Sequence, residues 1–212
     1  MGLYRMGPPT GLILALQERM GLGDFVETGT FRGDTAAWAA GHFSRVATIE
    51  LSPVYHAAAL VRFQSQPNVR ALQGNSGAML RQVVGDLTAP ALFWLDAHWS
   101  GLDTAGREAE CPLLDEVSVV NSSTATHAIL VDDARLFCAP PPRPHRAEQW
   151  PDLAATVSAL SDGGRRQVVL LDDVFVAVPA DFREFLGCWL QDQATATRTE
   201  GRLARWWKKV RG

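Results

Sequence analysis

Short apolar runs alternate with longer segments of mixed character along this 212-residue chain, and this alternation constrains the fold more than any other feature. The first five runs follow one another at spacings of roughly 20 to 35 residues, the length of a strand plus a crossover helix. The pattern predicts a parallel sheet with helices on both of its faces. These runs span residues 25–26, 46–49, 69–72, 91–95 and 128–131.

Two further apolar runs, 168–171 and 174–178, are separated only by Asp172 and Asp173. Two residues permit a hairpin but not a crossover, so the last strand is expected to run antiparallel to its neighbour. We therefore expect an α/β fold, a doubly wound and mostly parallel sheet of seven strands with an antiparallel last strand. Helices are expected at residues 12–20, 34–40, 53–64, 76–84, 113–121, 152–160 and 180–190.

Composition places the chain among globular proteins, as a single domain over residues 1–212. The contents of 47% hydrophobic and 20% charged residues are near globular averages and exclude a disordered or fibrous chain. A net charge of −3 gives no basic field that attracts nucleic acid. No apolar stretch is long enough to span a membrane. The three cysteines form no disulfide framework, and residues 11–16 lack a signal-peptide cleavage site, so we expect a cytoplasmic protein.

The turn after the first expected strand has a composition suited to ligand binding. It reads Glu-Thr-Gly-Thr-Phe-Arg-Gly from Glu27 to Gly33. Gly29 and Gly33 let the backbone turn tightly and approach a ligand, and the following helix offers free N–H groups. The glycines have the spacing GxxxG rather than GxGxxG, which disfavours a nicotinamide or flavin dinucleotide.

The next two strand ends carry polar residues that suit a nucleoside. Glu50 ends the second run, where a carboxylate can accept hydrogen bonds from ribose hydroxyls. Asn75 and Ser76 follow the third run, beside the position expected for an adenine. The alternative for Asn75 or Ser76 is a role only as the cap of the next helix.

Three carboxylates follow the fourth and fifth runs. Asp96 lies two residues before His98, and Asp132 and Asp133 end the fifth run. Carboxylates this close repel one another unless a cation lies between them or one of them is protonated. Oxygen ligands favour Mg²⁺, Ca²⁺ or Mn²⁺. The alternative is that one member of the aspartate pair caps the following segment while Arg135 pairs with the other.

Together these motifs resemble the class I S-adenosylmethionine-dependent methyltransferases in their order and spacing. The resemblance covers about residues 22–178 and implies a core of that extent, followed by a C-terminal helix and a basic, Trp-containing tail at 179–212. It also implies the strand order 3-2-1-4-5-7-6. The block from Glu27 to Gly33 resembles the macrocin O-methyltransferases, which modify sugar hydroxyls, and the acidic cluster resembles the magnesium site of catechol-type O-methyltransferases.

The resemblance implies a role for each of these residues. A bound metal would lower the pKa of a coordinated hydroxyl, whose oxyanion would attack the sulfonium methyl group. His98 is expected to act as the general base, and Asp96 as a second catalytic residue beside it. The implied S-adenosylmethionine-binding residues are Glu27, Thr28, Gly29, Thr30, Phe31, Gly33, Glu50, Asn75, Ser76 and Asp96, and the implied Mg²⁺ ligands are Asp96, Asp132 and Asp133.

The chain departs from the catechol-type pattern in its catalytic half. The lysine usual near the metal is missing, because the only lysines are Lys208 and Lys209. Asp133 stands where those enzymes carry Asn. His98 is expected to replace the lysine as base, although its ring could instead pack under Trp99 as a structural residue.

Two loops are expected to border the substrate opening. Residues 100–111 form a polar, Gly-containing segment that could close over a substrate. Residues 140–149, which begin with a proline-rich stretch, are expected to form the opposing wall. A zinc site is disfavoured, because its candidate ligands lack regular spacing: Cys111, Cys138, His98 and His145.

The C-terminal segment 202–211 is basic and aromatic. Such a segment could bind an anionic membrane surface, a partner protein or a polyanion. A packing helix or a frayed tail is the plainer alternative.

The sequence thus predicts an S-adenosylmethionine-dependent O-methyltransferase that acts on a small-molecule hydroxyl, of sugar or polyol type, with a divalent cation. The expected partner is this small-molecule substrate, with no nucleic acid and no transmembrane segment, and a homo-oligomer is compatible with the sequence. Two alternatives remain open. One is a hydroxylase-like enzyme on the same scaffold, which would use the acidic cluster for iron or magnesium. The other is a non-catalytic module that binds the cofactor or its product.

Overall fold

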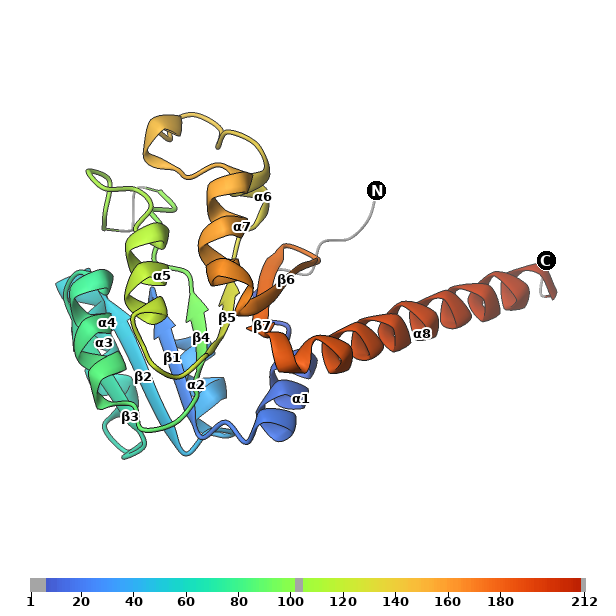
Figure 1. Ribbon diagram of the computed structural model, residues 1–212, viewed down its shortest axis with the longest axis horizontal. Helices are drawn as coiled ribbons and strands as arrows, with labels where there is room; N and C mark the ends of the chain where they lie inside the picture. Colours follow the sequence, from blue (N-terminus) through green and yellow to red (C-terminus); the bar gives the residue numbers. More distant parts are fainter. Residues whose placement is uncertain (1–6, 102–104, 211–212) are drawn as a thin grey trace.

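The computed structural model describes residues 7–101 and 105–210, with side chains through residue 196. Strands and helices alternate along the chain (Figure 1). The strands are β1 (Asp24–Thr28), β2 (Arg45–Glu50), β3 (Val69–Gln73), β4 (Leu92–Leu95), β5 (Ala128–Val131), β6 (Arg166–Leu171) and β7 (Val174–Pro179). The α-helices are α1 (Thr10–Met20), α2 (Asp34–Ala40), α3 (Pro53–Phe63), α4 (Ser76–Asp86), α5 (Leu113–Asn121), α6 (Arg135–Cys138), α7 (Leu153–Ser161) and α8 (Arg183–Val210). The 3₁₀ helices are η1 (Ala147–Gln149), η2 (Asp162–Gly164) and η3 (Ala180–Phe182).

The strands form one seven-stranded sheet in the order β3-β2-β1-β4-β5-β7-β6. β1 lies parallel to β2 and β4, β2 is parallel to β3, and β4 is parallel to β5. β7 is antiparallel to both β5 and β6. The predicted fold class and strand order are confirmed. Only a hairpin can connect β6 to β7 across Asp172 and Asp173, and these two strands are antiparallel for that reason.

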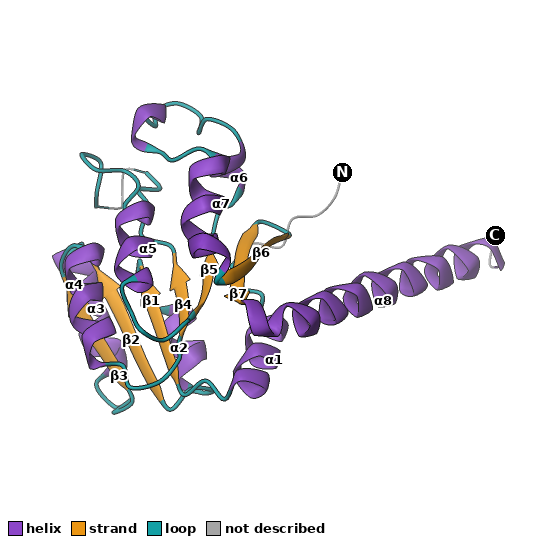
Figure 2. Cartoon of the chain, in the orientation of Figure 1, coloured by secondary structure: helices purple, strands orange, loops and turns teal. Residues whose placement is uncertain are grey.

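Helices cover both faces of the sheet (Figure 2). Successive side chains of a strand point to opposite faces, so Phe25 packs against α1 and α2 while its neighbour Val26 packs against α4 and α5. In β4, Leu92 and Phe93 divide between the two faces in the same way. All residues of β1, β4, β5 and β7 are buried, as expected for strands covered on both sides.

The C-terminal helix differs most from the prediction. The helix expected at 180–190 begins with η3 and continues as α8 for 28 residues. No proline follows Pro179 to end it, and Figure 1 shows α8 extending away from the sheet. The side chains of 202–211 lie outside the described residues, so the binding role considered for this segment stays a prediction. Among the helices that the structure describes, none is long and apolar enough to cross a membrane.

A buried arginine in the edge strand β6 forms hydrogen bonds to two neighbouring helices and to the residue before β5. Arg166, in β6, is only 3% exposed. Its Nε donates to the carbonyl oxygen of His127 at 2.9 Å, and its Nη1 donates to Asn121 Oδ1 at 2.8 Å and to the carbonyl oxygen of Leu160 at 3.2 Å. Burial lowers the pKa of Arg166. The residue therefore joins β6 to α5, to α7 and to the residue before β5.

Replacing Arg166 by Ala is expected to lower the free energy of unfolding by about 3 kcal/mol, because three buried hydrogen bonds are lost and their acceptors stay buried. Urea denaturation measures this loss. Arg165→Ala is the matched control, since within the described chain that exposed side chain pairs with Asp162 and Thr126. Its loss of stability should stay below about 1 kcal/mol. Equal losses in the two variants would contradict the assignment.

Candidate functional site

The turn between β1 and α2 lies against the end of β4. Gly29 has a φ of +82°, and a Cβ atom at this position would collide with the carbonyl group of Asp96. The N–H groups of Gly29 and Thr30 donate to the carbonyl oxygen of Ile49 at 2.9 and 3.3 Å. The turn is thus held between the ends of β2 and β4, and a residue with a side chain at position 29 would displace it.

Glu50, the last residue of β2, is oriented by two backbone N–H groups. Its Oε2 accepts a hydrogen bond from Phe31 N at 2.8 Å, and its Oε1 accepts one from Ser52 N at 2.8 Å. Phe31 has a φ of +46°, a left-handed conformation that a bulky residue rarely adopts. Each carboxylate oxygen of Glu50 keeps a second lone pair. Glu50 can therefore accept hydroxyl hydrogens from a ligand beside it.

A pocket opens beyond the carboxyl ends of β1 to β4. Of the predicted site residues, it is lined by Gly29, Phe31, Glu50, Asn75, Ser76, Asp96 and His98. Residues that the sequence analysis did not assign to the cofactor complete the wall, among them Leu51, Tyr55, Gly106, Cys111, Pro112 and Asp115. Asn75 also caps α4, as the alternative required, because its Oδ1 accepts Ala78 N at 3.1 Å.

The other predicted cofactor residues lie beside or beneath this pocket. Glu27, Thr28 and Thr30 are buried below it, with exposed fractions of 2%, 0% and 3%. Gly33 packs against α3, where an added Cβ atom would lie 2.9 Å from the ring of Phe63. These four residues shape the turn and the pocket floor from behind.

Glu27 is a buried carboxyl group whose hydrogen-bond partners among the described residues are hydroxyl groups. Its Oε2 accepts a hydrogen bond from Thr48 Oγ1 at 2.5 Å. Burial raises the pKa of Glu27 to about 8, although the hydrogen bonds from Thr48 and Thr35 oppose this rise. Near neutral pH the ligand-free chain therefore holds Glu27 mostly protonated, and a cation in the pocket would favour its ionised form.

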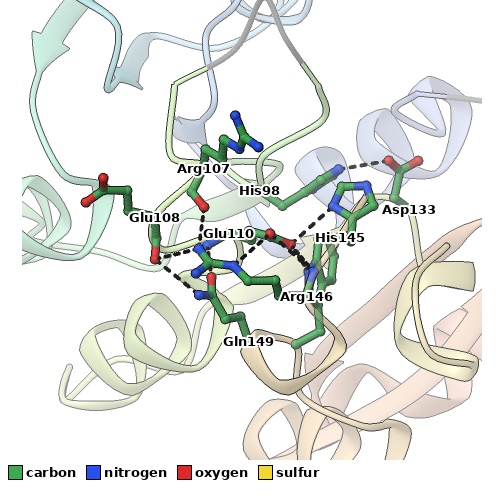
Figure 3. Close-up of polar contacts among 9 residues, drawn as sticks. His98, Arg107, Glu108, Glu110, Asp133, His145, Arg146 and Gln149 are labelled. Atoms are coloured by element: carbon green, nitrogen blue, oxygen red, sulfur yellow. Dashed lines mark hydrogen bonds and ion pairs between the residues drawn. The ribbon is translucent and has the colours of Figure 1, made fainter. Parts of the chain in front are cut away.

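His98 lies between two carboxyl groups at the ends of neighbouring strands. Its Nε2 lies 3.0 Å from Asp133 Oδ2 (Figure 3). Its Nδ1 lies 3.5 Å from Asp96 Oδ1. The ring of His98 contacts the ring of Trp150, with centroids 5.5 Å apart. The alternative that His98 packs under Trp99 is therefore wrong. Trp99 contacts the ring of His145 instead.

The three aspartates of this cluster differ in their electrostatics. Burial raises the pKa of Asp96 well above its usual range, and the charges of Asp132 and Asp133 raise it further. Burial also raises the pKa of Asp132 to about 6. Asp133 behaves oppositely: burial opposes its ionisation, but His98 and Arg135 lower its pKa. Asp133 is thus the member of the three whose negative charge is neutralised by neighbours.

The geometry does not fit the predicted magnesium site. Asp132 Oδ1 accepts the N–H of Asp133 at 2.8 Å, and Arg135 Nη1 contacts Asp133 Oδ1 at 2.5 Å. The imidazole of His98 separates Asp133 from Asp96. Among the side chains that the structure describes, no three His, Cys, Asp or Glu residues are grouped to hold a metal ion. The pairing of Arg135 with Asp133 is the one that the alternative interpretation required.

Glu110 joins the two loops that were expected to border the substrate. This residue is 1% exposed, and its carboxylate accepts a hydrogen bond from Arg146 N at 3.0 Å (Figure 3). It accepts another from Trp150 Nε1 at 2.9 Å. Burial alone would raise the pKa of Glu110, but these hydrogen bonds lower it. Described residues of the first loop line the pocket, whereas none of residues 140–149 does. The expected opposing wall is therefore wrong, because the second loop supports the first from behind; residues 102–104 lie outside the described chain.

Glu116, in α5, is a buried residue that the sequence analysis missed. It is 1% exposed, and its carboxyl group has side-chain hydrogen bonds with Thr28 and Ser76. Burial raises the pKa of Glu116 to about 7. Among the described atoms, its Oε1 has no hydrogen-bond partner. The signal that could have found it is its helical spacing from the apolar residues Leu113 and Val120, which places an acid on the buried face of α5.

Comparisons with known proteins identify the fold. No protein-family profile and no curated protein matches the sequence. A proposed caffeoyl-CoA O-methyltransferase from Staphylococcus aureus is similar in structure, with 14% identity, a TM-score of 0.57, and coverage of 83% of this chain and 86% of the other. An S-adenosylmethionine-bound amino pentose methyltransferase of calicheamicin biosynthesis from Micromonospora echinaspora has 15% identity, a TM-score of 0.51, and coverages of 80% and 87%.

An S-adenosylhomocysteine-bound methyltransferase from Podospora anserina is also similar, with 19% identity, a TM-score of 0.50, and coverages of 80% and 76%. At these identities the likeness shows the fold, which is the Rossmann-like fold of S-adenosylmethionine-dependent methyltransferases.

The raised pKa values predict how stability changes with pH. The pKa of Glu27 is near 4.5 in the unfolded chain and about 8 in the folded one. As the pH rises from 4.5 to 8, Glu27 ionises readily in the unfolded chain but not in the folded one, so the free energy of unfolding falls across this window. The melting temperature of the ligand-free chain should therefore fall between pH 6.5 and 8.5. In Glu27→Gln the fall should be smaller, because the amide does not titrate. Melting curves across this range at constant ionic strength measure the effect, and parallel pH profiles in the two proteins would contradict it.

Proposed function

We propose that this chain binds S-adenosylmethionine and transfers its methyl group to a hydroxyl oxygen of a small molecule, of sugar or polyol type. One observation carries the proposal: the pocket beside the close turn at Gly29 contains a carboxylate, Glu50, whose two oxygens are already oriented by backbone N–H groups. A ribose diol is the ligand group that such a carboxylate accepts best. In the similar structures from Podospora anserina and Micromonospora echinaspora, the bound molecules support this choice of cofactor.

The residues present suit each part of the cofactor. Glu50 would accept the ribose hydroxyls, and Asn75 and Ser76 would lie beside the adenine. The backbone at Gly29 would face the methionine portion. The bound cofactor supplies a methyl group on a positively charged sulfur. Glu27, buried under the turn, would stabilise this positive charge once it is ionised.

His98 is the base that we propose for the acceptor hydroxyl. Asp133 accepts the hydrogen on Nε2, which leaves the lone pair on Nδ1, toward Asp96 and the pocket. The proton of the hydroxyl would pass to Nδ1 as its oxygen bonds to the methyl group. Asp96 would orient the hydroxyl from the same side. Because the carboxylates do not converge, the proposed step does not use the predicted Mg²⁺, and titration with and without Mg²⁺ tests this.

The sugar-type acceptor is proposed because the turn from Glu27 to Gly33 resembles that of the macrocin O-methyltransferases. The similar structure from Micromonospora echinaspora is an amino pentose methyltransferase, and this supports a sugar-type acceptor for the present chain.

Calorimetric titration with S-adenosylhomocysteine and S-adenosylmethionine tests the cofactor. We expect micromolar binding by the native chain, unchanged by added Mg²⁺. Glu50→Ala should weaken binding by about 10- to 100-fold, because a hydrogen bond to a charged group contributes about 1.5–3 kcal/mol. Glu18→Ala, on the surface of α1, is the matched control and should bind like the native chain. Absence of binding by the folded native chain, or equal binding by the Glu50 variant, would contradict the proposal.

A further inference from the structure

The first turns of α8 pack on the protein body, and the rest of the helix extends beyond it. Leu186 is fully buried, and Trp189 and Leu190 pack against the core on the α1 side of the sheet. The residues that follow, 191–196, are all exposed. The helical backbone nevertheless continues to Val210, away from the sheet (Figure 1). At 1.5 Å per residue, the part beyond Leu190 is about 30 Å long.

The sequence of this extension has the spacing of an amphipathic helix. Four apolar residues stand at positions i, i+3, i+4 and i+7, which share one face of an α-helix. This apolar face consists of Leu203, Trp206, Trp207 and Val210. Five basic residues of the helix occupy the other directions and form a basic face: Arg198, Arg202, Arg205, Lys208 and Lys209.

A helix of this kind depends on a surface that covers its apolar face. Most helical stability in proteins comes from the packing of that face, and an isolated helix of this length is marginal in water. Gly201, in the middle of the extension, weakens the helix further. The part of α8 beyond Leu190 therefore needs a partner surface to remain helical.

Charge selects the kind of surface. Residues 198–211 contain six basic residues and one acid, Glu200, although the net charge of the whole chain is −3. Two such helices packed together would place like charges side by side, which opposes pairing with a second copy. A nucleic acid would neutralise the basic face but leave the apolar face in water. An anionic lipid surface suits both, because its acyl chains cover apolar side chains and its headgroups attract basic ones.

We propose that the part of α8 beyond Leu190 lies along an anionic membrane surface, with its apolar face toward the acyl chains and its basic face at the phospholipid headgroups. Tryptophan favours this interface, because its ring is apolar and its N–H group is polar. An amphipathic helix with so strongly charged a face lies in the plane of the interface. The proposal does not depend on the proposed function, since no described residue of α8 lines the pocket.

Flotation of the full chain with lipid vesicles tests the proposal. One set of vesicles is phosphatidylcholine alone, and the other contains phosphatidylcholine and phosphatidylglycerol in equal amounts. The native chain should bind the mixed vesicles and not the neutral ones. Binding should weaken as the salt concentration rises, because ions screen the attraction between the basic face and the headgroups.

Three double variants separate the contributions of the two faces. Lys208→Gln with Lys209→Gln should weaken binding by about 30-fold, because each basic residue near an anionic surface contributes about a fivefold factor. Arg19→Gln with Arg183→Gln removes the same charge from exposed positions near the body and should bind like the native chain. Trp207→Lys with Lys208→Trp keeps the composition and charge but places a cation on the apolar face. This exchange should weaken binding by at least about 10-fold.

The variants at 207–209 lie beyond the packed turns of α8, so they should keep the melting temperature of the native chain. Failure of the native chain to bind the mixed vesicles would overturn the proposal. Equal binding by the exchange variant would also overturn it, because the attraction would then be electrostatic alone. Analytical ultracentrifugation without vesicles tests a second copy as the partner. A dimer that the exchange abolishes, formed by a chain that binds no vesicles, would assign the apolar face to that copy instead.

Discussion

The candidate site depends on how closely the turn after β1 approaches the end of β4. β1 lies between β2 and β4 in the sheet, so its carboxyl end meets the ends of both strands. The absence of a side chain at Gly29 lets the turn contact the backbone of Asp96, whose N–H donates to the carbonyl oxygen of Thr28 at 3.1 Å. The same turn carries Phe31, whose N–H orients Glu50. One backbone contact therefore sets both the width of the pocket and the direction of its central carboxylate.

The second constraint is electrostatic. Carboxyl groups gather around and beneath the pocket, and burial is the largest cause of the raised pKa of Glu27, Asp96, Glu116 and Asp132. Burial thus favours the neutral form of each of these groups, and a ligand that brings positive charge into the pocket would favour the ionised form. Under the proposed function, the sulfonium group of the cofactor would bring such a positive charge.

The sequence predicted the sheet because apolar alternation and a two-residue hairpin are local patterns, and it placed Glu50 at the pocket because strand ends share one edge. It could not predict which way side chains turn at that edge. His98 lies between two of the carboxylates that the strand ends and the resemblance assigned to a metal. The sequence also could not predict contacts between distant segments. Glu110 contacts His145 and Trp150, which lie 35 and 40 residues further along the chain, and these contacts hold the second loop behind the first and away from the pocket. Asp115, which lines the pocket, was not predicted as a site residue, because an acid in the first turn of a helix is common.

A crystal structure of this chain with S-adenosylhomocysteine would show directly whether Glu50 holds the ribose. We expect both ribose hydroxyls to donate to the carboxylate of Glu50, with the homocysteine portion over the turn at Gly29. A ligand bound elsewhere on the chain, or in this pocket with its ribose away from Glu50, would overturn this assignment.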